Sequence, residues 1–171
     1  MSPTNFEPIG ECVRRVHRKT PTGADFKRGI AFGDDNIDPE KAVLAGSTKF
    51  EGFLSRDAVQ ARTLRELVHP DAYLELPTIS GEMATLEDFN EIEAEGTDFL
   101  VLTGTGVINS SAGVGTKLGF DGSGKLRVAQ PGDNYYFEIT ANSAVSSSTF
   151  ASRNGELRIR ARRTSGHIPS P

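Results

Sequence analysis

The sequence predicts a mainly β-protein, a small antiparallel barrel or sandwich with an extended N-terminal arm and at most one or two short helices. Over about the last seventy residues, short runs of strand-forming residues alternate with Gly-rich turns at a spacing of roughly ten residues, as in antiparallel folds. Ile, Leu, Val and Phe make up 41 of the 171 residues, so a core can be buried. The length fits one domain.

The first part of the chain is predicted to hold an arm and short strands. Residues 1–11 contain two prolines and no periodicity, which indicates an extended arm. Residues 12–72 are expected to be β-rich, with strands over 12–16, 27–32 and 48–53 around an acidic loop at 33–41.

One short helix is a candidate in this region. Asp57 is a suitable N-cap for residues 57–68, and Ala61, Leu64 and Val68 fall on one helical face. Pro70 would end such a helix. A strand over the same residues is the alternative.

Residues 73–162 are predicted to form the barrel core, and residues 163–171 a C-terminal tail. Asp121-Gly122 is the clearest hairpin signal, and Asn154-Gly155 is a second turn. Residues 82–93 carry apolar residues at a spacing of three, which is compatible with a helix, but the strand-like flanks favour short or irregular strands. Further strands are expected over 73–77, 97–103, 115–120, 125–129, 135–141 and 156–162.

Charge is distributed unevenly along the chain. Residues 34–98 carry sixteen acidic and five basic groups, whereas residues 153–171 carry five Arg and one Glu. An acidic middle with basic ends is not typical of a nucleic-acid-binding protein. Arg158, Arg160 and Arg162 alternate with apolar residues, which indicates the solvent-facing side of a last strand.

No catalytic motif is complete. Lys117 follows a Gly-rich stretch, but the Gly-rich residues after it cannot begin the helix that a phosphate loop requires. The serines around Ser110 and Ser146 lack a strained nucleophile turn, and no pattern holds His17 or His69 as a base. We therefore expect no enzymatic activity and no cofactor.

Metal ligands are equally sparse. One Cys and three widely spaced His exclude a multi-Cys zinc site and argue against a His-based one. The oxygen ligands of residues 34–38 are a weak calcium signal without the EF-hand spacing, so we expect no metal site. Neighbouring basic residues favour a lowered pKa for the Cys12 thiol, but without a partner cysteine we interpret Cys12 as a small apolar strand residue.

Several stretches resemble the capsid decoration, or cement, proteins of tailed bacteriophages. They are LPTISGE (76–82), EAEGTDFLVLTGTGVI (93–108), GVGTKLGFDGSGKLRVAQPGDNYYFEITA (113–141) and ELRIRAR (156–162), and FEGFLSRDA (50–58) fits more loosely. The resemblance covers about half of the chain. It rests on structural motifs, and the long N-terminal part has no counterpart in the smallest family members.

The resemblance implies a virion protein with a β-barrel or β-tulip core, made in the host cytoplasm. It would sit on the capsid exterior as a homotrimer and stabilise the shell by bridging major capsid protein subunits. It implies no nucleic-acid or membrane partner. An N-terminal arm would pair with the major capsid protein, and the arm residues expected to make this contact are Pro3, Thr4, Asn5, Phe6, Pro8 and Ile9.

Two other interpretations stay open on the sequence. One is a different virion β-protein, such as a tail, spike or head–tail joining component. The other is a small β-barrel that binds a glycan or another small ligand. The acidic region 34–98 would meet a basic partner surface or keep the protein in solution.

The N-terminus has no apolar h-region, so we expect no signal peptide.

Overall fold

The computed structural model of the chain describes residues 5–24, 26–55, 81 and 83–171. Every regular element within these residues is a β-strand. Among them, no helix is long and apolar enough to cross a membrane. The strands are β1 (Phe6–Lys19), β2 (Ala31–Asp34), β3 (Ala42–Leu44), β4 (Gly52–Leu54), β5 (Met83–Glu95), β6 (Lys117–Phe120), β7 (Leu126–Val128), β8 (Asn134–Asn142) and β9 (Arg158–His167).

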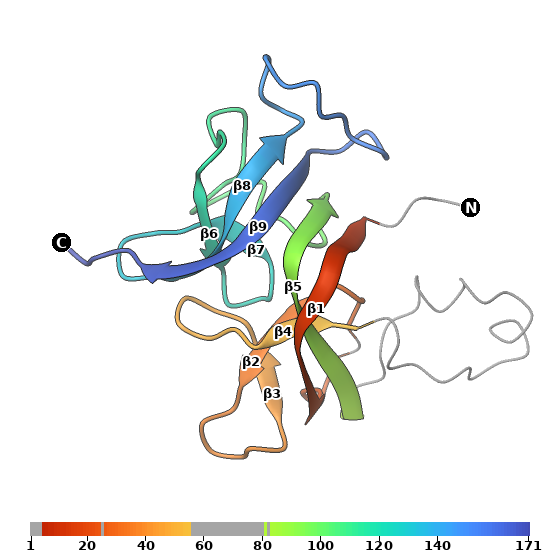
Figure 1. Ribbon diagram of the computed structural model, residues 1–171. Helices are drawn as coiled ribbons and strands as arrows, with labels where there is room; N and C mark the ends of the chain where they lie inside the picture. The colour runs from red at the N-terminus through yellow and green to blue at the C-terminus, as the bar shows by residue number, and fades with distance from the viewer. Residues whose placement is uncertain (1–4, 25, 56–80, 82) are drawn as a thin grey trace, which may run out of the picture.

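These strands form one antiparallel sheet, which confirms the predicted mainly-β fold. Their order is β3-β2-β4-β5-β9-β8-β6-β7, and β1 pairs with β5 beside this path. The sheet curls so that β6 to β9 lie in one part of the molecule and β2 to β4 in the other (Figure 1). The result is a barrel-like, curled sheet.

The long strand β5 joins the two parts (Figure 1). Leu86 and Glu87 pair with β4, residues 91–95 pair with β9, and β1 pairs with β5 along most of its length. A strand forms here because the residues alternate: Leu86 and Ile92 are buried in the core, while Glu87 and Glu93 bind arginines. The predicted boundary after residue 72 falls between β4 and β5, and these two strands pair directly in the same sheet.

Aromatic rings fill the concave side of the sheet. Phe50 and Phe120 stack with ring centroids 4.8 Å apart, and Phe53 packs 5.6 Å from Phe137. Such pairs contribute beyond the area that they bury. The core therefore links strands from both parts of the molecule.

The predicted hairpin at Asp121-Gly122 connects β6 and β7. The Asp121 carboxylate accepts hydrogen bonds from the backbone N–H groups of Ser123 and Lys125. Gly122 and Gly124 have φ of +93° and +77°, which only glycine adopts freely. Gly155 likewise has φ of +82° in the turn that precedes β9.

Several element predictions are wrong. Strands expected over 27–32 and 48–53 begin only at Ala31 and Gly52, and residues 83–95 form one long strand instead of short or irregular ones. Residues 97–103 do not form a strand, because the Gly96 carbonyl accepts the N–H groups of Phe99 and Leu100 and closes a turn. Their apolar side chains are nevertheless buried, which explains the strand-like sequence. The tail expected at 163–171 is also shorter, because β9 continues to His167 through its pairing with β8. The helix expected at 57–68 and the strand at 73–77 lie outside the described residues.

Candidate partner-binding edge

Strand β1 lies at an edge of the sheet. It spans 14 residues and pairs antiparallel with β5 from Phe6–Ala94 to Lys19–Met83. Among the described residues, no named strand pairs with its other edge. An open strand edge presents unpaired N–H and C=O groups to any chain that approaches it. We therefore take this edge as the candidate site.

The N-terminal end of β1 is not the free arm that the sequence predicted. Phe6, Pro8 and Ile9 lie within β1 and pair with β5, and the Asn5 carbonyl accepts the N–H of Glu95. The Phe6 ring packs 4.8 Å from that of Phe53, so burial holds this end against the core. The two prolines and the missing periodicity indicated an arm, but an edge strand tolerates Pro, so they do not exclude a strand here. The predicted contact residues Pro3 and Thr4 lie outside the described residues.

Irregularities divide the edge into two parts. The register shifts between Ile9 and Cys12 and again between Cys12 and Arg14. Gly10 within the first shift has φ of +81°. Bulges and proline are common ways to prevent uncontrolled pairing at an edge. The regular part of the edge therefore runs from Arg14 to Lys19.

Alternation of the backbone shows which groups of this regular part face outward. The Lys19 N–H donates to the Glu40 carbonyl, away from β5. On the opposite side of β5, the Thr85 carbonyl accepts the N–H of Ser55, so Thr85 turns away from its partner His17. Because orientation alternates along a strand, His17 and Arg15 also direct their backbone groups away from β5. None of the described residues hydrogen-bonds to these outward groups.

The side chains on this part of the edge expose mainly positive charge. Arg15 forms an ion pair with Glu87 at 3.4 Å, but the Arg15 side chain is 55% exposed and that of Glu87 only 5%. Arg14 is exposed and donates to the Glu51 carbonyl oxygen. His17 is exposed and contacts the Thr85 hydroxyl through Nδ1 at 3.1 Å. At Arg15, a partner approaching the edge therefore meets the cation before its counter-charge, whereas at Lys19 the Glu40 side chain is the more exposed of the pair.

The buried Glu87 carboxylate supports this surface from beneath. It accepts a hydrogen bond from the Ser55 hydroxyl. Burial acts to raise the pKa of Glu87, but hydrogen bonds from Ser55 and Cys12 and the charge of Arg15 outweigh it, so this pKa is lowered. Burial, reinforced by the Glu87 hydrogen bond, raises the pKa of the Cys12 thiol, so the lowering suggested by its basic sequence neighbours does not occur.

A second charged group holds the N-terminal end of β1 in place. We call it the glutamate–arginine cluster, and it consists of Glu7, Glu93, Glu95, Arg153, Arg158 and Arg160. Arg158 is fully buried and donates from Nε to Glu93 at 3.0 Å and from a terminal nitrogen to Glu95 at 3.3 Å. Burial acts to raise the pKa of Glu93, but hydrogen bonds from Arg158 and Arg160 hold it below its ordinary value.

The same cluster anchors the loop between β8 and β9. The Glu95 carboxylate accepts backbone N–H groups of Arg153, Asn154 and Glu156 at 3.0–3.3 Å. The Asn154 side chain also binds that of Asn5. The cluster thereby fixes both the N-terminal end of β1 and the loop before β9 to β5. Of the arginines predicted to lie on a solvent-facing strand side, Arg160 and Arg162 are exposed, whereas Arg158 is buried, and all three form ion pairs.

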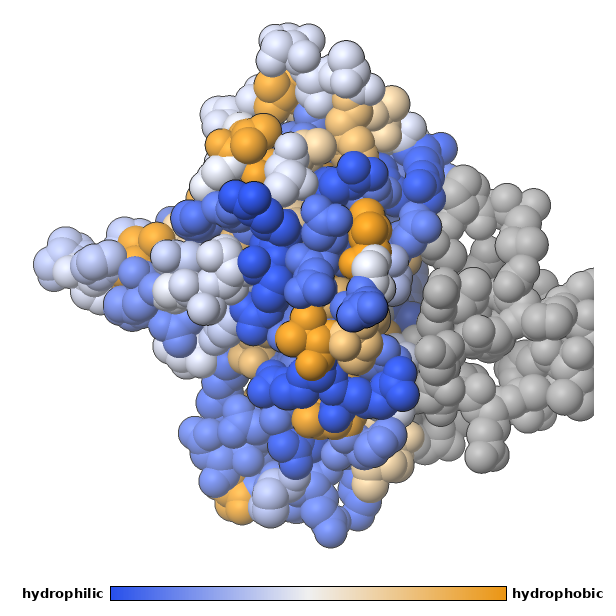
Figure 2. Space-filling view, viewed as in Figure 1, coloured by the Kyte–Doolittle hydropathy of each residue, from blue (hydrophilic) through white to orange (hydrophobic). Residues whose placement is uncertain are grey.

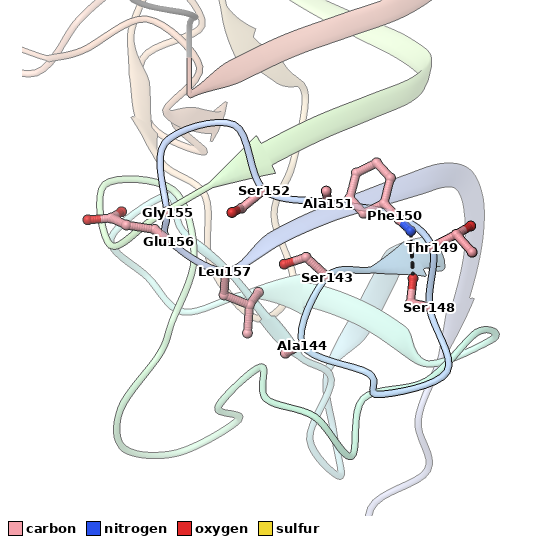
Figure 3. A pocket seen from close by; sticks show the side chains of 10 residues that line it. All are labelled: Ser143, Ala144, Ser148, Thr149, Phe150, Ala151, Ser152, Gly155, Glu156 and Leu157. Atoms are coloured by element: carbon pink, nitrogen blue, oxygen red, sulfur yellow. Dashed lines mark hydrogen bonds between the residues drawn. The ribbon is translucent and has the colours of Figure 1, made fainter.

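This loop borders a shallow pocket (Figure 3). Its lining combines hydroxyl side chains with the ring of Phe150, and the Ser148 hydroxyl accepts the N–H of Phe150. The Arg160 guanidinium lies 5.5 Å from the centre of the Phe150 ring and so occupies one of its faces. Among the described residues that line the pocket there is one carboxylate, Glu156, and no histidine or cysteine.

The oxygen ligands noted at residues 34–38 are used within the acidic loop itself. Asp35 and Asp38 accept the N–H groups of Ile37 and Glu40, which uses their carboxylates to shape the acidic loop. Within the residues that the structure describes, no three or more His, Cys, Asp or Glu are placed to hold a metal ion. Lys117 binds Glu138 across the β6–β8 pair, as expected for a sheet side chain.

No protein-family model matches the chain, and no curated protein matches it. Hydrophilic side chains gather over the face that carries β1 and β5, interrupted by separate small apolar patches (Figure 2).

Proposed function

We propose that this chain is a non-enzymatic structural protein of a phage virion. It binds the outside of the capsid shell, as a homotrimer, and stabilises the shell by bridging major capsid protein subunits. The observation that carries the proposal is the edge of β1 away from β5, with which no strand among the described residues pairs. Strand edges bind extended segments through main-chain hydrogen bonds, which suits a protein that attaches to a lattice without a deep pocket.

Two further features support this proposal. The sequence resembles decoration proteins over about half of its length, including the hairpin at residues 113–141. Strand β1 is also held firmly, because its N-terminal end packs on Phe53 and its Glu7 carboxylate binds Arg153. A fixed edge loses little conformational entropy on binding, and weak contacts become strong when a symmetric shell repeats them.

The proposal predicts direct binding to undecorated capsids. Purified full-length protein is mixed with expanded, undecorated phage capsids, and bound protein is measured by co-sedimentation and by a symmetry-averaged electron-microscopy map. We expect lattice-wide density in groups of three and capsids that resist heating and chelator better than untreated ones. Failure to bind, with no gain in resistance, would contradict the proposal.

The same map separates the main alternative. Density at a single vertex or along a tail, without lattice-wide occupancy, would identify a tail, spike or head–tail joining component instead. Deleting residues 1–11 is a poor variant for this assay, because it removes Phe6 and Glu7 and with them part of the core and of the glutamate–arginine cluster. Substitutions on the outer edge of β1 are the sharper probe.

A further inference from the structure

We infer that the β1 edge between Arg14 and Lys19 receives a short, acidic, extended segment of a partner protein as an added antiparallel strand. This inference deepens the proposed function by naming the chemistry of the partner. It also moves the contact from the predicted residues at the chain's start to the middle of β1.

The free part of the edge is short and has defined ends. Toward the C-terminus, the Lys19 N–H is already bonded to the Glu40 carbonyl, so pairing stops there. Toward the N-terminus, the register shift between Cys12 and Arg14 interrupts the strand. The outward N–H and C=O groups of Arg15 and His17 lie between these limits. A segment of about four to five residues would satisfy all four groups.

The exposed charge selects an acidic segment. Arg15 is 55% exposed while its Glu87 partner is 5% exposed, and the neighbouring Arg14 guanidinium binds a carbonyl oxygen. Opposite charges on neighbouring strands stabilise the pair, and like charges weaken it. Main-chain pairing thus supplies affinity, and Asp or Glu side chains opposite the arginines supply specificity.

The same charges disfavour a second copy of this chain. Antiparallel pairing of two β1 edges about their regular part would place the Arg14–Lys19 segments of the two copies against each other. This segment contains Arg14, Arg15, Arg18 and Lys19 and no acidic residue. Such pairing would set cations opposite cations at an exposed surface. The edge therefore favours a different, acidic chain over self-association.

A peptide array tests the inference directly. An array of random heptapeptides is probed with the full-length protein, and the composition of the bound peptides is compared with that of the array. We expect enrichment of Asp and Glu and depletion of Pro. The best peptide is then methylated at single backbone nitrogens along its length. Methylation at every second position should weaken binding about fivefold to tenfold, because those N–H groups face β1, and methylation at the positions between them should have little effect.

Protein variants locate the binding edge. Because the His17 N–H faces away from β5, His17→Pro removes an outward donor without removing a β1–β5 hydrogen bond, and Arg14→Glu reverses an exposed charge. Each substitution should weaken the affinity for the selected peptide about fivefold or more. Lys125→Glu in the β6–β7 hairpin makes the same charge change elsewhere and should leave binding unchanged. If the His17→Pro variant does not fold, binding by the Arg14→Glu variant and binding of the methylated peptides still test the inference.

The outcomes distinguish the inference from the proposed function. Bound peptides without acidic enrichment, or binding that survives Arg14→Glu and backbone methylation, would overturn the inference. So would binding of a single-stranded oligonucleotide through Arg14 with no peptide selected. If the wild-type protein still decorates capsids in that case, the proposed function stands. If acidic peptides are selected but the protein does not bind capsids, the inference about the β1 edge is supported and the proposed virion role is contradicted.

Discussion

At the level of single residues, Arg158 is the most deeply buried arginine of the glutamate–arginine cluster. Its side chain is 1% exposed, and its two buried partners, Glu93 and Glu95, are 3% and 0% exposed. The two carboxylates belong to β5, and Arg158 is the arginine of the cluster whose guanidinium binds both of them. Removing one partner of a buried ion pair leaves an uncompensated charge, which is more costly than the pair is stabilising.

Replacing Arg158 should therefore destabilise the protein strongly. We expect Arg158→Ala to lower the free energy of unfolding by about 3–5 kcal/mol, measured by urea denaturation. Arg162→Ala on the same strand is the matched control. The Arg162 side chain is 63% exposed, so its loss should cost about 1 kcal/mol or less. Equal effects of the two substitutions would show that burial of Arg158 does not matter to stability.

At the scale of elements, the β6–β7 hairpin depends on backbone conformation. Gly122 and Gly124 both have positive φ, but they differ in their surroundings. A Cβ at Gly122 would meet nothing within 4 Å, whereas a Cβ at Gly124 would lie 2.6 Å from the Ala31 carbonyl oxygen. The second glycine therefore serves both the turn and the close approach of the hairpin to β2.

This difference gives a graded prediction. Gly122→Ala should destabilise by about 1–2 kcal/mol, the cost of a left-handed conformation for an L-residue. Gly124→Ala should cost clearly more, because the backbone of β2 must also move. Gly113→Ala, where φ is not positive and the space is open, should change stability by less than about 0.5 kcal/mol. Thermal and urea unfolding of the three variants measure the order, and a Gly124→Ala effect no larger than that of Gly122→Ala would contradict it.

Element type was predictable where local chemistry decides it. The Asp121-Gly122 turn and strands β6 to β8 follow from turn residues and alternation, which act over a few neighbours. The run from Thr97 to Thr103 looked like a strand because Phe99 and Leu100 are apolar, yet both residues lie in a turn and are buried there. Burial alone does not specify a strand, and only the tertiary contacts decide between the two.

At the scale of the whole molecule, the open edge was not predictable from the sequence. Residues 1–11 and 12–16 looked like an arm and a short strand, and only the register with β5, more than sixty residues away, makes them one edge strand. The acidic run in β5 looked like a solvated surface, but Glu87, Glu93 and Glu95 are buried against arginines from β1 and β9. Pairing between distant segments sets both features, and a local pattern cannot reveal it.

The central claim, that the outer edge of β1 is the attachment surface, is tested most directly by amide-resolved hydrogen exchange. The full-length protein is measured alone and bound to undecorated capsids. We predict that the outward amides of Arg15 and His17 exchange rapidly in the free protein and at least about tenfold more slowly when bound. The amides of Val16 and Arg18 face β5 and should be protected in both states. Capsid binding with no change at Arg15 and His17 would contradict the claim.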